Sequence, residues 1–157
     1  MKINMYSKNI LLYVLLISAL TLNSCRVSLI SNYDADISKQ IENTAKVVDR
    51  FYLMMLETTS TENEGRAYNN FSEQYVDIQV ELNSLLSKNK IRPLNENSTR
   101  ICEITTQLWV KYKKEHKKKN HLSDGIIQLN QQTFSDLFFT MQIAEKAKDM
   151  INKPALK

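Results

Sequence analysis

Apolar side chains recur at alternating steps of three and four residues through the middle of this chain, and this spacing constrains the fold more than any other feature. In the clearest run the apolar members are Tyr68, Phe71, Tyr75, Ile78, Leu82 and Leu85. A helix with 3.6 residues per turn places side chains at such steps on one face. The run therefore predicts an amphipathic helix that buries this face against neighbouring helices.

Residues that favour helix ends lie on either side of this predicted helix. Thr61-x-x-Glu64 has the pattern of a capping box, which predicts that the helix begins near Thr61 and that Gly65 falls in its first turn. We expect the helix to stop near Ser87, because the polar segment that follows contains Pro93.

A preceding helix is expected over residues 36–58, with Asp34 or Asp36 as its N-cap. The side chains at its three- and four-residue steps are expected to be buried, and they are Ile37, Ile41, Thr44, Val48, Phe51 and Met55. Both helices therefore offer one apolar face to a partner.

Two more helices are expected in the second half of the chain. The third begins at Asn97 or Ser98 and ends in a series of lysines, and its predicted buried face holds Ile101, Ile104, Leu108 and Tyr112, with Trp109 beside it. The fourth follows Ser123 as N-cap, and its predicted inner residues are Ile127, Asn130, Phe134, Leu137, Met141, Ala144 and Ile151, with Phe138 nearby.

Glycine and proline number only two each in the whole chain, which is unusual for a β-rich protein and ordinary for a helical one. Four amphipathic helices with short connections predict an all-α fold, arranged as an antiparallel up-down four-helix bundle with coiled-coil-like packing. The bundle is expected over residues 34–153, followed by a tail at 154–157. A helical hairpin that completes its core by dimerising is the structural alternative, and the oligomeric state stays open.

The start of the chain has a different character. Lys2 and Lys8 precede an apolar run from Ile10 to Leu22. As a helix this run would reach roughly 20 Å, which is less than the bilayer core of about 30 Å. A short apolar run after a basic start is typical of a secretory signal rather than of a permanent membrane span.

The run closes on Leu22-Asn23-Ser24-Cys25, which resembles the lipobox of bacterial lipoproteins. In that family the cysteine thiol receives a diacylglycerol, the chain is cut just before it, and the new amine is often acylated. The resemblance implies that residues 1–24 are a removed signal peptide, that Cys25 is the lipidated N-terminus, and that residues 25–33 form a short tether. An uncleaved anchor, or an ordinary signal peptide with an incidental cysteine, is the alternative.

The lipobox resemblance also implies a location. In Gram-negative cells, lipoproteins with Asp after the cysteine tend to stay in the inner membrane, whereas Arg26 occupies that position here. The expected location is therefore the outer membrane, facing the periplasm, or the outer face of the plasma membrane in a Gram-positive cell. The rest of the chain resembles small helical lipoproteins of unknown role, and that resemblance assigns no further site residues.

A group of cations is the most prominent charged feature, and we call it the lysine run: Lys111, Lys113, Lys114, Lys117, Lys118 and Lys119. Cations suit the dipole at a helix C-terminus, so a solvated helix end is one interpretation. The other is a contact with an anionic partner, either lipid head groups or cell-wall carboxylates and phosphates. The formal charge of the whole chain is only +4, so no nucleic-acid partner is expected.

Few other residues indicate chemistry. His116 and His121 are the only histidines, and the neighbouring ammonium groups would oppose a metal cation, so no metal or cofactor is expected. Glu73, Asp77 and Glu81 recur at four-residue steps off the apolar stripe, which predicts a water-facing ridge. Cys102 is the only cysteine after Cys25, so it has no partner there for an internal disulfide. It is expected to be a small buried apolar residue.

These features together predict a lipid-anchored, non-enzymatic interaction protein of the cell envelope that docks a protein or an anionic envelope partner. One alternative is a ligand-binding bundle whose internal cavity is lined by Phe71, Tyr75 and Phe134. A second is a mobile-element lipoprotein that acts in exclusion or lysis. An enzyme is not expected, because no serine, cysteine or threonine has an identifiable base partner in the sequence.

Overall fold

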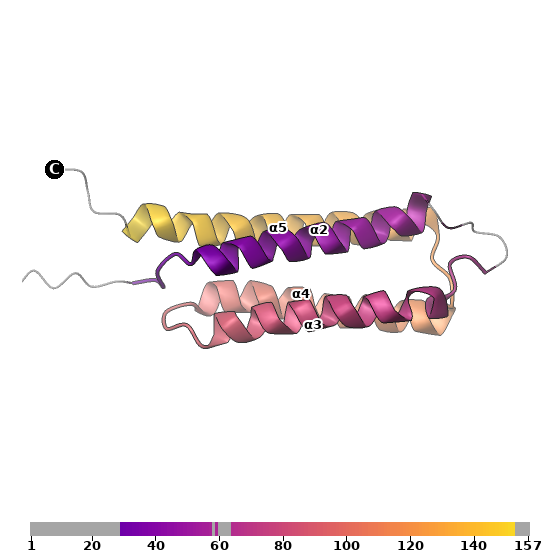
Figure 1. Ribbon diagram of the computed structural model, residues 1–157, viewed down its shortest axis with the longest axis horizontal. Helices are drawn as coiled ribbons and strands as arrows, with labels where there is room; N and C mark the ends of the chain where they lie inside the picture. The colour runs from indigo at the N-terminus through magenta and orange to yellow at the C-terminus, as the bar shows by residue number, and fades with distance from the viewer. Residues whose placement is uncertain (1–28, 58, 60–63, 153–157) are drawn as a thin grey trace, which may run out of the picture.

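The computed structural model describes residues 29–57, 59 and 64–152, and within these ranges it contains helices, turns and connections but no strand. Its elements are α2 (Ala35–Glu57), the short 3-10 helix η1 (Tyr68–Phe71), α3 (Ser72–Lys90), α4 (Glu96–Lys119) and α5 (Asp124–Asn152), shown in Figure 1. The predicted all-α fold with four α-helices is therefore confirmed. The predicted signal peptide 1–24, Cys25 and the tail 154–157 lie outside the described residues.

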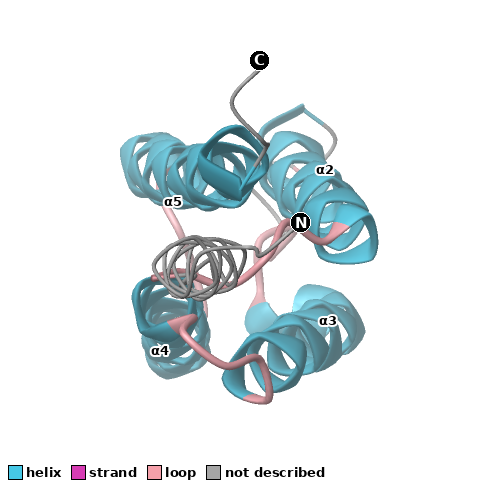
Figure 2. Cartoon of the chain, turned by 90° about the vertical axis from the view of Figure 1, so that its left-hand side faces the viewer, coloured by secondary structure: helices cyan, strands magenta, loops and turns pink. Residues whose placement is uncertain are grey.

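Each α-helix contacts two others. α2 lies against α5 and α3, and α4 lies against α3 and α5, as the end-on view in Figure 2 shows. Figure 1 shows that residues 29–34, the α3–α4 connection and the last turn of α5 share one end, which we call the proximal end. The opposite end, formed by residues 64–71 and 116–124, is called the distal end.

The first helix begins as its sequence predicts. The Asp34 carboxylate accepts hydrogen bonds from the N–H groups of Asp36 (2.9 Å) and Ile37 (3.1 Å), so it satisfies donors that the first turn would otherwise leave free. All of the residues predicted to be buried in this helix are buried, and Tyr52 joins them. The predicted face of α2 is therefore confirmed.

The apolar face of the second helix is also confirmed, but its predicted start is wrong. Glu64 has φ 57°, which is left-handed and not helical, and Gly65 lies in a turn instead of a first helical turn. The Asn70 amide donates to the carbonyls of Glu64 (3.0 Å) and Gly65 (3.2 Å), and this bonding holds the segment as a loop. Thr61 lies outside the described residues. α3 begins only at Ser72 and continues to Lys90, past the predicted end near Ser87.

The buried face of α4 differs from the predicted one by a rotation of about one residue. The predicted members Ile101, Ile104, Leu108 and Tyr112 are only half-buried. The buried residues are instead Ser98, Cys102, Thr105, Trp109 and His116. Trp109, the largest side chain of the helix, is completely buried and sets this orientation. The helix begins at Glu96, one or two residues before the predicted start at Asn97 or Ser98. It ends at Lys119, where Asn120 takes the left-handed conformation of a C-terminal cap.

The last helix starts directly after Ser123, as predicted, and buries Ile127, Asn130, Phe134 and Met141. Leu137 and Ala144 are half-buried. The prediction fails at Ile151, which is 62% exposed. Beyond Met141 the buried positions are Glu145 and Lys148, because these charged side chains find partners at the proximal end. No helix within the described ranges combines the length and the apolar character needed to span a bilayer.

Candidate interaction site

The lysine run lies on the last turns of α4, at the distal end. Lys113 alone is half-buried, and its Nζ donates to Gln79 Oε1 at 3.1 Å, while the other members are exposed. Lys111 Nζ is 3.9 Å from a carboxylate oxygen of Glu115. Lys117 Nζ is 5.7 Å from the centre of the Tyr68 ring, within the range of a cation–π contact.

Three members of the run have no such partner. Within the described ranges, Lys114, Lys118 and Lys119 are exposed and form no ion pair. Their ammonium groups are therefore available to an anionic partner.

Beneath the lysine run, His116 is completely buried, which the sequence did not reveal. Its Nε2 is 2.8 Å from the Arg66 carbonyl oxygen, and its Nδ1 is 3.1 Å from the Tyr75 hydroxyl. Since a carbonyl oxygen only accepts, Nε2 carries the proton and Nδ1 accepts from the hydroxyl. Burial lowers the pKa of His116 and favours this neutral form.

His121, the other histidine, is exposed. In the described part of the chain, no group of three or more histidine, cysteine or acidic side chains could hold a metal ion. His116 is therefore a structural residue of the distal end that joins α4 to α3 and to the loop before η1.

Aromatic rings fill the centre of the core. The Phe51 ring lies 4.8 Å from Tyr75 and 5.4 Å from Trp109, measured between ring centres. Phe134 lies 5.4 Å from Trp109, and Phe71 lies 5.9 Å from Phe51. The three residues predicted to line a ligand cavity, Phe71, Tyr75 and Phe134, thus belong to one packed ring cluster.

A cluster of buried charges occupies the proximal end and was missed by sequence reasoning. Glu145 is 1% exposed, and its carboxylate accepts from the Arg92 guanidinium (3.1 and 3.2 Å) and from Lys148 Nζ (2.5 Å). It also accepts from the backbone N–H of Asp34 at 2.9 Å. Burial lowers the pKa of Lys148, while the contact with Glu145 opposes this shift.

The same cluster extends to the N-terminal segment through Asn95. Its Oδ1 accepts from Lys148 Nζ (2.6 Å) and from the Ser31 hydroxyl (2.9 Å), and its Nδ2 donates to Asn89 Oδ1 (2.9 Å). Ser31 N–H donates to the Leu94 carbonyl at 2.9 Å. Of the predicted tether 25–33, the described part includes Ser31, which is thus bonded to the α3–α4 connection.

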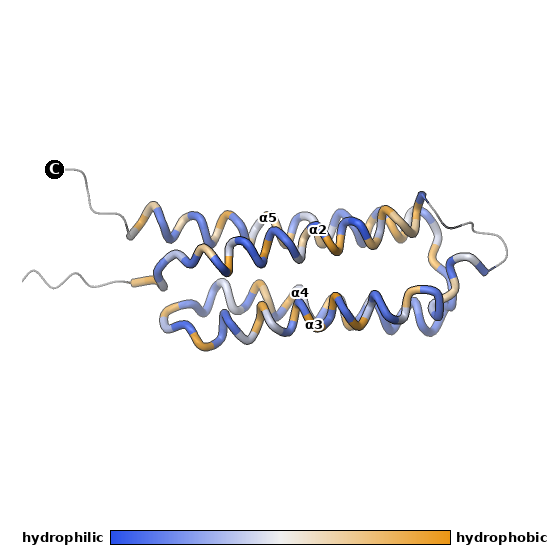
Figure 3. Tube along the Cα trace, viewed as in Figure 1, coloured by the Kyte–Doolittle hydropathy of each residue, from blue (hydrophilic) through white to orange (hydrophobic). Residues whose placement is uncertain are grey.

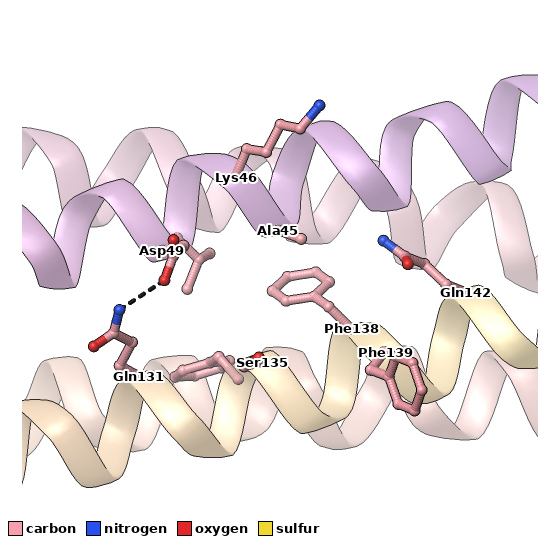
Figure 4. Close-up of a pocket in the computed structure, with 10 residues that line it drawn as sticks. Ala45, Lys46, Asp49, Gln131, Ser135, Phe138, Phe139 and Gln142 are labelled. Carbon is pink, nitrogen blue, oxygen red and sulfur yellow. Dashed lines mark hydrogen bonds between the residues drawn. The ribbon is translucent and has the colours of Figure 1, made fainter.

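A shallow groove lies between α2 and α5 (Figure 4). Its volume is about 270 Å³, and Ala45, Phe138 and Phe139 form part of its wall. The Gln131 amide donates to Asp49 at 2.7 Å across one end. The charged residues of its lining are Lys46, which is paired with Glu42, and Asp49, which is bonded to Gln131.

Two remaining expectations are confirmed. Glu73, Asp77 and Glu81 are all exposed on α3 and form the predicted water-facing ridge. Cys102 is buried, its Sγ is 4.0 Å from Met141 Sδ, and burial raises the pKa of its thiol to about 12. The thiol is therefore a packing group rather than a nucleophile.

Within the described residues, exposed lysines gather at the distal end, and large apolar side chains are exposed elsewhere on the surface. Comparison of the chain with protein-family models, with curated proteins and with solved structures finds no match in any of the three.

Proposed function

We propose that this chain is a lipid-anchored, non-enzymatic interaction protein of the bacterial cell envelope. Residues 1–24 are removed on export, and acylated Cys25 holds the protein at a membrane, which is the outer membrane facing the periplasm in a Gram-negative cell. Its helices form an antiparallel up-down four-helix bundle with coiled-coil-like packing. The contacts of each α-helix with two neighbours support this arrangement.

The observation that carries the proposal is the distance between the N-terminal segment and the lysine run, which belong to opposite ends of the helices (Figure 1). At about 1.5 Å per residue, Lys111 and Lys119 lie roughly 22 and 34 Å along α4 from Glu96. Electrostatic attraction is screened over about 8 Å at physiological salt. On an upright bundle, the lysine run is therefore beyond the head groups of the anchoring bilayer and faces an anionic partner elsewhere in the envelope.

The cell wall is the anionic surface that this geometry suits, because its carboxylates and phosphates lie across from the membrane that holds the lipid. The uncommitted ammonium groups of Lys114, Lys118 and Lys119 supply the contact. The ring cluster around Trp109 favours this role over the ligand-cavity alternative, since Phe71, Tyr75 and Phe134 pack on other rings. The hollow that Phe134 also lines is the shallow groove between α2 and α5, not a cavity inside the bundle.

The test is co-sedimentation of the full chain with purified cell-wall sacculi at low and at high salt. Each lysine near an anionic surface contributes about 1 kcal/mol. The triple exchange of Lys114, Lys118 and Lys119 to Gln is therefore expected to weaken binding about a hundredfold at low salt.

The matched control removes the same charge elsewhere, by exchanging the exposed lysines Lys39, Lys46 and Lys146 to Gln. These residues lie on α2 and α5 outside the lysine run, so binding should fall much less. Equal binding by the two triple variants would contradict the assignment of the lysine run as the contact.

A further inference from the structure

Large apolar side chains are exposed together at the proximal end. The exposed fractions are 83% for Leu29, 82% for Ile91, 71% for Met150 and 48% for Leu94. Figure 3 shows hydrophobic colouring on the three segments that carry them, at the same end of the molecule. Leu29 and Leu94 also line a common hollow of about 180 Å³ with Ala144 of α5. We call these four exposed side chains the apolar tip.

Hydrogen bonds hold the backbone of the apolar tip in place. Ser31 N–H donates to the carbonyl oxygen of Leu94 itself, and the Arg92 guanidinium donates to the Asn32 carbonyl while it is paired with Glu145. Three separate segments are thus bonded to one another before any partner arrives. A surface ordered in advance loses little conformational entropy when it binds.

Two cations next to the apolar tip are paired with carboxylates, while Glu96, which lines the hollow shared by Leu29 and Leu94, is exposed and forms no ion pair within the described residues. Lys90 Nζ is 3.2 Å from a carboxylate oxygen of Glu103, and Arg92 is 3.1 Å from Glu145. The surface is therefore suited to an apolar partner and differs in kind from the lysine run, whose unpaired cations suit an anion.

The place of Cys25 in the sequence, close to the apolar tip, indicates which apolar partner this is. Cys25 precedes Leu29 by four residues, a reach of at most about 14 Å. The head-group layer of one leaflet is about 5–8 Å thick, judging from a core of about 30 Å within a bilayer of about 40–45 Å. An anchor at Cys25 therefore holds the apolar tip within reach of the bilayer interface.

We propose that the apolar tip inserts into the interfacial layer of the bilayer, next to the lipid on Cys25. This inference rests on the proposed anchor and adds an orientation to it. The helices stand on the membrane with the proximal end immersed and the lysine run directed away. Apolar burial at the tip supplies a second attachment beside the acyl chains.

The test uses tryptophan fluorescence of the full chain on neutral phosphatidylcholine vesicles with brominated acyl chains, which quench only indoles that reach the lipid. Ile91→Trp places the probe in the apolar tip. Val76→Trp is the matched control, since Val76 is also exposed (49%) and lies on α3 roughly 22 Å from Ile91 along the helix. Native Trp109 is completely buried and provides the background.

We expect strong quenching of the Ile91→Trp variant, none of the Val76→Trp variant beyond the parent, and no dependence on salt. In a mature chain that begins at position 25 and carries Cys25→Ser, both the lipid and the apolar run from Ile10 to Leu22 are absent. There the double exchange of Ile91 and Leu94 to Ser should weaken vesicle partitioning about a hundredfold, since each buried aliphatic side chain contributes about a factor of ten. Both positions are exposed in the described structure, so the exchange leaves the core intact.

Mass spectrometry of the wild-type protein purified from its native membrane separates this inference from the anchor itself. Lipid on Cys25 with an unquenched Ile91→Trp variant would overturn the membrane tip and leave the anchor standing. An unmodified Cys25 with a quenched Ile91→Trp variant would overturn the anchor and leave the membrane tip standing. Equal quenching of both variants would mean that the bundle lies flat, and an unquenched chain that sediments as a dimer would assign the apolar tip to a second copy. Either result would refute the proposed orientation.

Discussion

Loss of the negative charge at Glu145 is expected to destabilise the protein far more than loss of any exposed carboxylate. The Glu145→Gln variant keeps the shape of the side chain but removes the charge that faces Arg92 and Lys148. Within the described residues Arg92 and Lys148 form no other ion pair, so both cations would then lack an acidic partner. Removal of one partner from a buried ion pair typically costs about 3–5 kcal/mol.

The structure favours the lower part of that range. The Arg92 side chain remains 13% exposed, so water can solvate part of its guanidinium after the exchange. The amide oxygen of the introduced glutamine can also still accept the Asp34 N–H, which in the wild-type protein bonds to the Glu145 carboxylate at 2.9 Å. We therefore expect a loss of about 3 kcal/mol in the free energy of unfolding.

A double-mutant cycle separates the cost of an unpaired charge from the net value of the pair. The Glu145→Leu and Lys148→Leu exchanges should each cost about 3 kcal/mol alone, but the double variant should cost much less than their sum, because no charge of this pair is then left buried without a partner. The exposed pair Lys111–Glu115 provides the control, and Glu115→Gln should change stability by less than about 0.5 kcal/mol.

The assay is urea unfolding followed by helical circular dichroism. If Glu145→Gln costs no more than Glu115→Gln, the charges at the proximal end are not buried in the way described. Additive single exchanges in the cycle would equally refute the coupling between Glu145 and Lys148.

Three other predictions concern the core. The buried Tyr52 hydroxyl has no hydrogen-bond partner within the described residues, so Tyr52→Phe should raise the free energy of unfolding by about 1 kcal/mol, whereas Tyr75→Phe should lower it by about 1 kcal/mol through loss of the bond to His116. Because burial lowers the pKa of His116, its contribution to stability should be complete above about pH 6.5 and decline below it by at most about 1.4 kcal/mol per pH unit, a dependence that His116→Gln should remove. Since burial raises the pKa of Cys102 to about 12, its thiol should react with a thiol reagent at neutral pH only as fast as the folded chain opens.

Each of these predictions has a clear contrary result. Destabilisation by Tyr52→Phe would mean that its hydroxyl has a partner. An unchanged pH dependence in His116→Gln would show that another group causes it. Labelling of Cys102 at the rate of a free thiol would place it on an accessible surface.

The sequence predicts α2 and the apolar face of α3 well, because their buried positions are almost all large apolar residues at helical steps. It fails on α4, where Cys102, Thr105 and His116 occupy the buried face and the larger aliphatic residues flank it. Small and polar residues give a weak apolar pattern. The neighbouring stripe of Ile101, Ile104, Leu108 and Tyr112 is more hydrophobic, so the sequence favours it as the buried face. Only the complete burial of Trp109 fixes the correct face.

The proximal charge cluster is hidden for a different reason. Phe134, Phe138, Met141, Glu145 and Lys148 continue one series of four- and three-residue steps, so the spacing does place both charges on the buried face. Charged residues are almost never fully buried unless they are paired. The appearance of Glu145 and Lys148 after Met141 therefore suggests that the apolar face has ended. Their partners Arg92 and Asn95 come from a distant connection, which helical spacing cannot reveal.

The central claim is that a lipid on Cys25 attaches these helices to a membrane, and intact mass spectrometry of the protein purified from its native membrane tests it most directly. We expect a chain that begins at Cys25 and carries the added mass of a diacylglycerol, with or without an amide-linked acyl chain. A chain that begins at Met1 with an unmodified thiol at Cys25 would contradict it.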